Sequence, residues 1–403
     1  MAKDEMKTKL RLQVLSPIHI GTGEKLSLWD FALRSNYMFA IRVEEVLEDL
    51  YNKDKSRYED ALSKLEKGEG KIDEFLPNRI PEEWIIYRME LHPSINTEKI
   101  KEISTAVKNI GVNLRPKLYI PASTIKGFVR TAIIYRYIRD NFNEFAEKFK
   151  QINRKFSFKK VVENKILDDP SKDPMKYLHI EDIYGDLHGQ IVGVKILLSS
   201  KSFWVENVEA ISKGRSEAFT IKTVINDNNG ILSKRIGKYI IEWKKCCYEF
   251  SKDIIEAEVR FWEDLLKDEK GHAALISKLG RLSREEFNDI VNRIRKLNNR
   301  MVEGVINQLK EIGKENTEDT PVMRIGKFTG YMSHTVGVLL NRNVDKYKHA
   351  DQPYNIAPIG GDIGAKNAKR FLFPLTRRLT LDGKILGWCR LVPEGSINRQ
   401  GGE

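Results

Sequence analysis

Three stretches of the chain combine glycine with hydroxyl or cationic side chains, a combination suited to holding phosphate. They are SPIHIGTG at Ser16–Gly23, YIPASTIKGFVR at Tyr119–Arg130 and RIGKFTG at Arg324–Gly330. Glycine lets backbone N–H groups approach an anion closely, and lysine or arginine neutralises its charge. The first stretch is not a dinucleotide-binding fingerprint, because GxGxxG is incomplete. The third lacks the GK[ST] ending of a P-loop, so it does not support nucleotide hydrolysis. The three stretches are therefore candidate anion-binding loops, although the second, taken alone, is more simply a strand-to-helix turn with solvated basic residues.

The second stretch lies within Leu118–Arg139, which predicts a short strand, a tight loop and a long helix. Pro121 ends the strand because it has no N–H for a ladder. Ser123 or Thr124 is placed to cap the helix. Helical spacing predicts one buried face, made of Ile125, Phe128, Val129, Ala132 and Ile133.

The starts of two predicted helices are candidate anion sites, since the first turn of a helix has unpaired N–H groups. Lys126 and Arg130 are four residues apart and share a face of the first helix, close to Gly127. In the third stretch, a glycine loop containing Arg324 and Lys327 precedes a helix predicted to begin near Thr329–Tyr331. The two arrangements predict similar anion-binding loops.

His19 is the histidine of the first stretch, and its side chain could act as a general base in RNA cleavage. Such cleavage also needs an acid for the leaving oxygen, and the sequence offers only Lys126 or a tyrosine as a partner. A packed or hydrogen-bonded histidine is therefore the favoured interpretation. His334 is assigned a surface or core role for similar reasons.

The composition favours a soluble protein of a reducing compartment, the cytoplasm, with a polyanionic partner. The chain has 403 residues, a formal charge of +12 and 31% charged residues. No apolar run approaches the roughly 18 residues that span a bilayer, and no signal peptide is evident. Cys246, Cys247 and Cys389 match neither a zinc spacing nor a disulfide framework, so neither a metal nor another cofactor is expected.

The remaining patterns predict an α+β fold. Strands are predicted at Leu10–Leu15, Asp30–Leu33, Tyr37–Arg42, Leu178–Ile183, Gln190–Ser199, Ser202–Ile211 and Ser216–Ile225. Helices are predicted at Val43–Tyr51 and from Ile231 to Glu315, and a hairpin at Arg377–Val392 turns on Asp382-Gly383. An interrupted ferredoxin-like arrangement fits this order best.

Two units follow from this order. The first spans residues 1–228 and has a helical insertion at about 52–115. The second spans residues 229–403 and has a helical insertion at about 231–318. The insertions carry mixed charge, which is most simply a solvated surface.

The order and character of four blocks resemble one family. The blocks are SPIHIGTG, YIPASTIKGFVRTA, RIGKFTGYMSHTVG and FPLTRRL…LGWCRL. Together they resemble the RAMP superfamily of CRISPR proteins, and within it the fifth subunit of type III-A Csm effector complexes. The resemblance implies two RRM-related, ferredoxin-like RAMP units with helical insertions.

The resemblance also implies a function in antiviral defence. Such subunits cap the backbone filament of the complex at the 3′ end of the guide CRISPR RNA and help it bind target RNA. Their implied partners are the guide and target RNAs, the neighbouring backbone subunit and the small helical subunit, without a membrane. The implied subunit is not an enzyme. GGDIG at Gly360–Gly364 lacks the second adjacent aspartate of a palm-type motif.

The implied RNA contacts lie in the three glycine-bearing stretches. They are Ser16, His19, Gly21, Gly23, Ser123, Thr124, Lys126, Gly127, Arg130, Arg324, Gly326, Lys327 and Gly330. Arg377 and Arg378 could contact RNA or a neighbouring subunit. A guide of variable sequence is expected to be held through phosphates and 2′-hydroxyls rather than through base edges.

Two other functions remain open at the level of sequence. One is a RAMP endoribonuclease that processes CRISPR RNA through His19. The other is a repeated backbone subunit that cuts target RNA with Asp168, Asp169 or Asp173 and a metal ion. The polar segment containing these aspartates is more simply a surface turn, and a membrane-surface role is supported by charge alone.

Overall fold

The structure is a computed structural model. It describes residues 5–110, 116–145, 163–167, 173–198, 205–224, 236–266, 284–342 and 376–396. Among these residues, no helix is both long and apolar enough to cross a bilayer. Gly360–Gly364, Asp168 and Asp169 lie outside the described residues.

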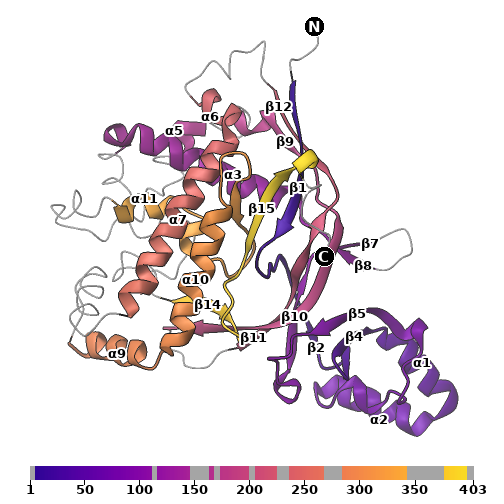
Figure 1. Ribbon diagram of the computed structural model, residues 1–403. Coiled ribbons are helices and arrows are strands. Elements are labelled where there is room, and N and C mark those ends of the chain that lie inside the picture. The colour runs from indigo at the N-terminus through magenta and orange to yellow at the C-terminus, as the bar shows by residue number, and fades with distance from the viewer. Residues whose placement is uncertain are drawn as a thin grey trace, which may run out of the picture.

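One large mixed sheet organises the described part of the chain (Figure 1). Its main path runs β13-β15-β1-β11-β10-β5-β4-β3, and β12, β9, β14, β2 and β6 branch from it. The strands on the main path are β13 (Val322–Arg324), β15 (Trp388–Pro393), β1 (Glu5–Val14), β11 (Val205–Ser216), β10 (Gly185–Leu197), β5 (Ile85–Leu91), β4 (Tyr37–Ile41) and β3 (Phe31–Arg34). The branches are β12 (Phe219–Val224), β9 (Leu178–Ile180), β14 (Arg377–Thr380), β2 (Gly21–Ser27) and β6 (Glu102–Ala106).

Strand β1 joins the two ends of the chain. It pairs antiparallel with β12 and β11 on one side and with β15 on the other, where Leu12 is opposite Leu391. Leu10 and Leu12 are completely buried. The strands of the predicted second unit therefore belong to the same sheet as those of the first. The predicted boundary at residue 228 stays a prediction.

A layer of helices covers one face of this sheet (Figure 1). Helix α3 packs against α7, and α7 packs against α10 and β13. The helices are α3 (Ala122–Asp140), α6 (Gly237–Ile241), α7 (Trp243–Leu265), α9 (Arg284–Arg295), α10 (Asn299–Glu315) and α11 (Gly337–Arg342). The predicted apolar face of α3 is confirmed, because all five residues from Ile125 to Ile133 named for it are buried. Cys246 and Cys247 are buried free thiols of α7, as predicted.

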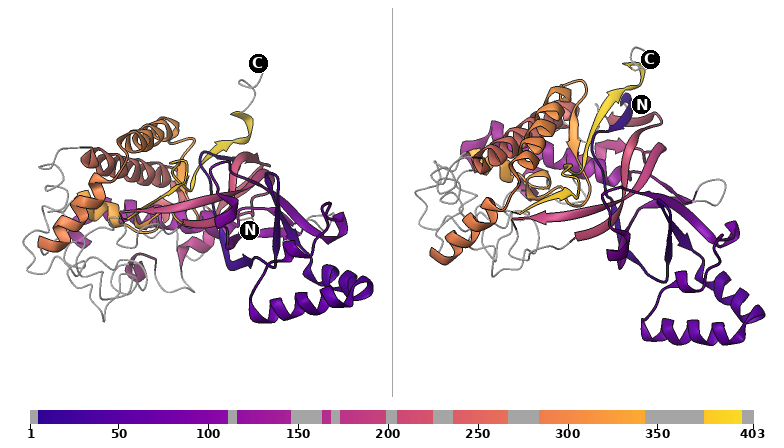
Figure 2. Two further views of the ribbon diagram at one scale, coloured as in Figure 1. Left: turned by 90° about the horizontal axis from the view of Figure 1, so that it is seen from below. Right: turned by 60° about the horizontal axis from the view of Figure 1, so that its bottom comes forward.

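A second, smaller core lies away from the helical layer (Figure 2). Helices α1 (Val43–Lys53) and α2 (Lys55–Lys67) pack there against the β3–β4 hairpin, through Trp29, Val46, Ala61 and Phe75. The hairpin turns on Ser35-Asn36 as predicted, and Ser35 has a φ of 50°.

Two predicted elements differ from the structure. Residues 52–115 contain the helix α2, but also β5 and β6 in the main sheet and β7 (Lys108–Ile110), which pairs with β8 (Pro116–Leu118) just beyond the predicted insertion. In β5 the exposed charged residues Arg88 and Glu90 conceal the strand pattern. Asp382-Gly383 does form a turn, with Gly383 N–H donating to the Thr380 carbonyl. The strands on either side separate, because β14 pairs with β10 whereas β15 pairs with β1 and β13.

Candidate functional site

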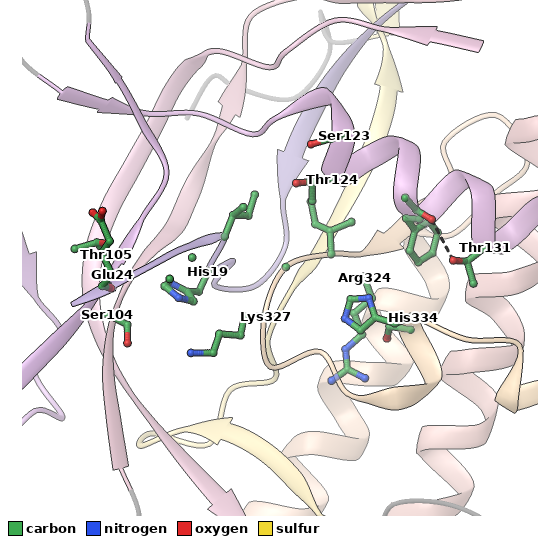
Figure 3. A pocket seen from close by; sticks show the side chains of 18 of the residues that line it. His19, Glu24, Ser104, Thr105, Ser123, Thr124, Thr131, Arg324, Lys327 and His334 are labelled. Carbon is green, nitrogen blue, oxygen red and sulfur yellow. Dashed lines mark hydrogen bonds between the residues drawn. The ribbon is translucent and has the colours of Figure 1, made fainter. Parts of the chain in front are cut away.

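The three glycine-bearing stretches surround one open cleft of about 660 Å³ (Figure 3). The cleft lies between the start of β2, strand β6, the first turns of α3 and the loop after β13. Its lining residues are His19, Ile20, Gly21, Gly23, Glu24, Lys25, Ser104, Thr105, Ser123, Thr124, Gly127, Phe128, Thr131, Arg324, Ile325, Gly326, Lys327, Ser333 and His334. Glycines and hydroxyl side chains make up much of this lining, so it offers many hydrogen-bonding groups.

The first stretch is fixed at two points before it reaches the cleft. Ser16 is buried, and its hydroxyl accepts a hydrogen bond from the Trp388 N–H at 2.8 Å. Ile18 forms an isolated bridge with Ile211 of β11. Ser16 therefore joins the first loop to β15 and does not line the cleft, whereas His19, Gly21 and Gly23 do.

His19 is buried at the base of the cleft, with 1% of its surface exposed. Its Nδ1 lies 2.7 Å from the Glu209 carbonyl oxygen, which can only accept, so Nδ1 carries the proton. The ring stacks on Phe328 at a centroid distance of 5.6 Å. Burial lowers the pKa of His19, which therefore remains a neutral imidazole at pH 7.

The third stretch is bound directly to the first. Lys327 N–H donates to the His19 carbonyl at 2.8 Å. Gly326 has a φ of +88°, and a Cβ at this position would lie 2.5 Å from the same oxygen. Only glycine fits there without strain, because both the backbone angle and the close approach exclude a side chain. The two loops therefore form one wall of the cleft.

A carboxylate beneath this wall fixes the Lys327 side chain. Glu206 is buried and accepts from Lys327 Nζ at 2.6 Å and from the Ser104 hydroxyl at 2.8 Å. Burial alone would raise the pKa of Glu206, but the two hydrogen bonds outweigh it and lower the pKa overall. The Lys327 side chain remains 51% exposed, so its remaining N–H groups can reach a ligand.

The start of α3 differs from the sequence prediction. Pro121 is the N-cap residue and no side chain of its own turn caps the helix. Instead Asp182, from the loop after β9, accepts from the Ala122 N–H at 2.7 Å. The prediction that Ser123 or Thr124 caps the helix is therefore wrong. The helix begins directly after Pro121, which places both residues within its first turn, where they line the cleft.

The predicted helix after Gly330 is also different. A 3₁₀ turn covers Tyr331–Ser333, and α11 begins only at Gly337. The Ser333 and Thr335 hydroxyls donate to backbone carbonyls four residues earlier, and Thr335 also accepts from the Gly337 N–H. Such side-chain bonds compete with regular helix formation. This loop therefore presents hydroxyls and His334 to the cleft, without a long helix.

Several predicted cations are held by carboxylates. Arg130 donates to Glu163 at 2.8 Å and also bonds Asp173. Arg377 donates to Glu258 at 2.8 Å. Arg324 lines the cleft but is only 5% exposed, and burial lowers its pKa to about 10. These arginines support the packing of the helical layer.

The structure thus divides the predicted site residues into two groups. Those that line the cleft are His19, Gly21, Gly23, Ser123, Thr124, Gly127, Arg324, Gly326 and Lys327. Those outside it are Ser16, Lys126, Arg130, Gly330, Arg377 and Arg378. The role of either group in RNA binding stays a prediction.

The sequence predictions missed one wall of the cleft. Ser104 and Thr105 come from β6, whose sequence EISTA lies in the segment that was expected to be a helical insertion. The β-branched residues of this run are the signal that could have identified the strand. Glu24 and Lys25 of β2 were missed because that strand is almost entirely exposed. Within the described residues, no cluster of three His, Cys, Asp or Glu could hold a metal ion.

Comparisons with known proteins agree with one another. A family model for the RAMP superfamily matches residues 11–284. The CRISPR system Cms protein Csm5 of Methanocaldococcus jannaschii is 26% identical over 423 residues, covering 95% of this chain and 88% of that protein.

Two solved structures share the fold. A chain in a cryo-electron microscopy structure of a Csm–crRNA–target RNA ternary complex of a type III-A CRISPR-Cas system superposes with a TM-score of 0.64 at 20% identity. It covers 95% of this chain and all of that one. The crystal structure of T. onnurineus Csm5 superposes with a TM-score of 0.59 at 21% identity. The match covers 94% of this chain and 99% of that one. The α+β prediction is confirmed, and the chain belongs to the RAMP superfamily.

Proposed function

We propose that this chain is a non-catalytic, RNA-binding subunit of a type III-A CRISPR effector complex. It caps the backbone filament at the 3′ end of the guide RNA and helps the complex bind target RNA. The observation that carries the proposal is the convergence on one cleft of three glycine-bearing stretches, of which the first and the last are about 300 residues apart in sequence. The similarity to Csm5 proteins along almost the whole chain supports the assignment to this subunit.

The cleft suits the backbone of single-stranded RNA. Gly21, Gly23 and Gly127 leave backbone groups accessible, and the hydroxyls of Ser123 and Thr124 can bond phosphate or ribose oxygens. Lys327 supplies a positive charge at the opposite wall. Such contacts do not depend on the base, as a subunit that accepts guides of any sequence requires.

The partners follow from this role. They are the guide CRISPR RNA, the target RNA, the neighbouring backbone subunit and the small helical subunit. The complex acts in the cytoplasm, where guide and target RNAs meet. No membrane contact is part of the proposal.

The alternative of a target-cutting backbone subunit is less well supported. Of its candidate aspartates, Asp173 is described, and it bonds Arg130 and accepts from the Met175 N–H at 2.8 Å. Both interactions fix the fold beside α3. Asp173 is thus occupied as a structural carboxylate and is not presented to a metal ion.

Co-purification with the products of neighbouring genes tests the proposal. The chain should co-purify with the other subunits and with repeat-derived RNA, at one copy per guide. Absence of repeat-derived RNA would contradict RNA binding, and several copies per guide would indicate a repeated backbone subunit. Cleavage of precursor RNA by the isolated protein, lost in His19→Ala, would indicate a processing nuclease instead.

A further inference from the structure

His19 contains a buried polar atom that the fold does not satisfy. Nδ1 donates to the Glu209 carbonyl, so in the neutral ring Nε2 carries a lone pair and can only accept. Within the described residues, Nε2 has no hydrogen-bonding partner although it is buried. A buried acceptor without a donor costs stability, so such atoms call for an explanation. The ring is at the cleft, and Figure 3 places it between Ser104 and Lys327.

The residue in front of Nε2 is a glycine. A Cβ at Gly21 would lie 2.8 Å from Nε2, closer than any ordinary contact. The backbone of Gly21 does not require glycine, since it has no positive φ. The absence of a side chain therefore leaves space beside the one unsatisfied nitrogen of the ring. Gly21 is part of the exposed start of β2, so this space opens towards the cleft.

Neither neighbouring donor bonds Nε2. The Ser104 hydroxyl donates to Glu206, and Lys327 Nζ donates to the same carboxylate while keeping further N–H groups for a ligand. The Glu209 side chain is fixed by other bonds, because its carboxylate accepts from the Tyr87 hydroxyl at 2.6 Å and from the Ala106 N–H at 2.7 Å, and it also bonds Lys108 Nζ. These bonds hold the strand that fixes His19 Nδ1. The tautomer of His19 is thus determined by the fold. No described residue donates to Nε2, so a ligand in the cleft can supply the donor.

We propose that His19 Nε2 accepts a hydrogen bond from a ribose 2′-hydroxyl and thereby selects RNA over nucleic acids without this group. The inference rests on the proposed function, and it specifies which chemical group of the RNA this site reads. A 2′-hydroxyl is a donor that every ribonucleotide carries, whereas the amino groups of bases vary with sequence. Lys327, adjacent to the His19 carbonyl, lies where the phosphate of the same nucleotide can be neutralised.

The test is a double-mutant cycle with the full chain, in which a change in the protein is combined with a change in the sugar of the RNA. Binding of a repeat-derived RNA is compared with binding of the same sequence in 2′-fluoro form, which keeps an RNA-like sugar but cannot donate. The wild-type protein should bind the hydroxyl form about tenfold more tightly through this contact. His19→Phe retains a ring against Phe328, and it should lower the preference about tenfold while leaving affinity for the fluoro form unchanged.

A second variant covers Nε2 without removing the imidazole. Gly21→Ala should lower the preference in the same way, because its methyl group occupies the space in front of Nε2. Gly304→Ala is the matched control, since Gly304 lies in α10 away from the cleft and a Cβ there meets nothing within 4 Å. It should retain the wild-type preference. If His19→Phe does not fold, Gly21→Ala decides the question.

The outcomes separate the inference from the proposed function. A wild-type preference that survives in Gly21→Ala and in folded His19→Phe overturns the role of His19. Equal wild-type affinity for the two forms also overturns it, while leaving RNA binding intact. Failure of the wild-type protein to bind either form contradicts the proposed function itself.

Discussion

Cationic side chains in the helical layer and in the cleft differ in what surrounds them. In the layer, Arg136 is 6% exposed and donates to Glu242 at 2.7 Å, with Glu249 2.9 Å from its Nε. In the cleft, Lys327 also meets a carboxylate but keeps half of its side chain in solvent. The first kind of cation is part of the core, and the second is available to a ligand. Exposure, more than residue type, therefore separates structural cations from candidate RNA contacts.

The largest effect should come from removing a carboxylate of the helical layer. Glu258→Ala leaves the buried guanidinium of Arg324 without the carboxylate that faces it at 3.9 Å, and removes one charged partner of Arg377. We expect a loss of about 3–5 kcal/mol in the free energy of unfolding, measured by urea denaturation. Glu256→Ala, on the same helix but more exposed, should cost less than about 0.5 kcal/mol. Equal losses of stability in the two variants would show that burial does not separate structural carboxylates from exposed ones.

The next effect tests the contact between the two loops of the cleft wall. Gly326→Ala combines an unfavourable φ with a clash against the His19 carbonyl, and should destabilise the protein by about 2–4 kcal/mol. Gly330→Ala also places alanine in an unfavourable backbone conformation, with φ +82° and ψ 171°, but its Cβ meets nothing within 4 Å, so it should cost about 1–3 kcal/mol, less than Gly326→Ala. The difference between their urea midpoints isolates the loop contact. Identical midpoints would show that the loops are not in contact.

The next variant asks whether Arg130, which the sequence predicted to bind phosphate, instead stabilises the fold. Arg130→Ala deprives Glu163 and Asp173 of their charged hydrogen bonds, so we expect a loss of about 1–3 kcal/mol. Lys126 has no carboxylate within ion-pair distance among the described residues, and Lys126→Ala should change stability by about 0.5 kcal/mol or less. A larger loss for Lys126→Ala would reverse the roles assigned to this pair.

The smallest effect is a dependence of stability on pH. Burial lowers the pKa of His19, so the unfolded chain binds a proton more readily than the folded protein does. Stability is therefore fully present above the unfolded pKa of about 6.5 and falls as the pH drops below it. Between pH 7 and 5.5, His19 should account for a loss of up to about 1 kcal/mol in the free energy of unfolding.

One variant isolates this contribution. His19→Phe should flatten the decline in the free energy of unfolding by that amount. An unaltered decline in His19→Phe would indicate that His19 titrates normally.

Local patterns predicted the framework of the molecule well. The stripe of α3, the Ser35-Asn36 hairpin and strand β1 each follow from residues adjacent in the sequence. The grouping of His19, Gly127 and Lys327 around one cleft also agrees with the expectation that the glycine-bearing stretches act together. That expectation came from the resemblance to the RAMP superfamily, since periodicity alone places no two stretches side by side.

The parts that the sequence did not predict depend on distant partners. Asp182 replaces Ser123 as the capping group because the chain after β9 returns to the start of α3. Arg130 becomes structural only because Glu163 and Asp173 lie opposite it. Ser104 was missed because its strand is only five residues long and becomes part of the sheet only through the distant strands β2 and β11. None of these pairings leaves a signal within a short window.

The salt dependence of RNA binding is the most direct test of the cleft. The affinity of the full chain for a repeat-derived RNA is measured over a range of salt concentrations, for the wild-type protein, Lys327→Ala and Arg130→Ala. Removing one phosphate contact from a single strand lowers the slope of log affinity against log salt by about 0.7. We predict this change for Lys327→Ala and the wild-type slope for Arg130→Ala. A reduced slope in Arg130→Ala together with a wild-type slope in Lys327→Ala would contradict the placement of RNA in the cleft.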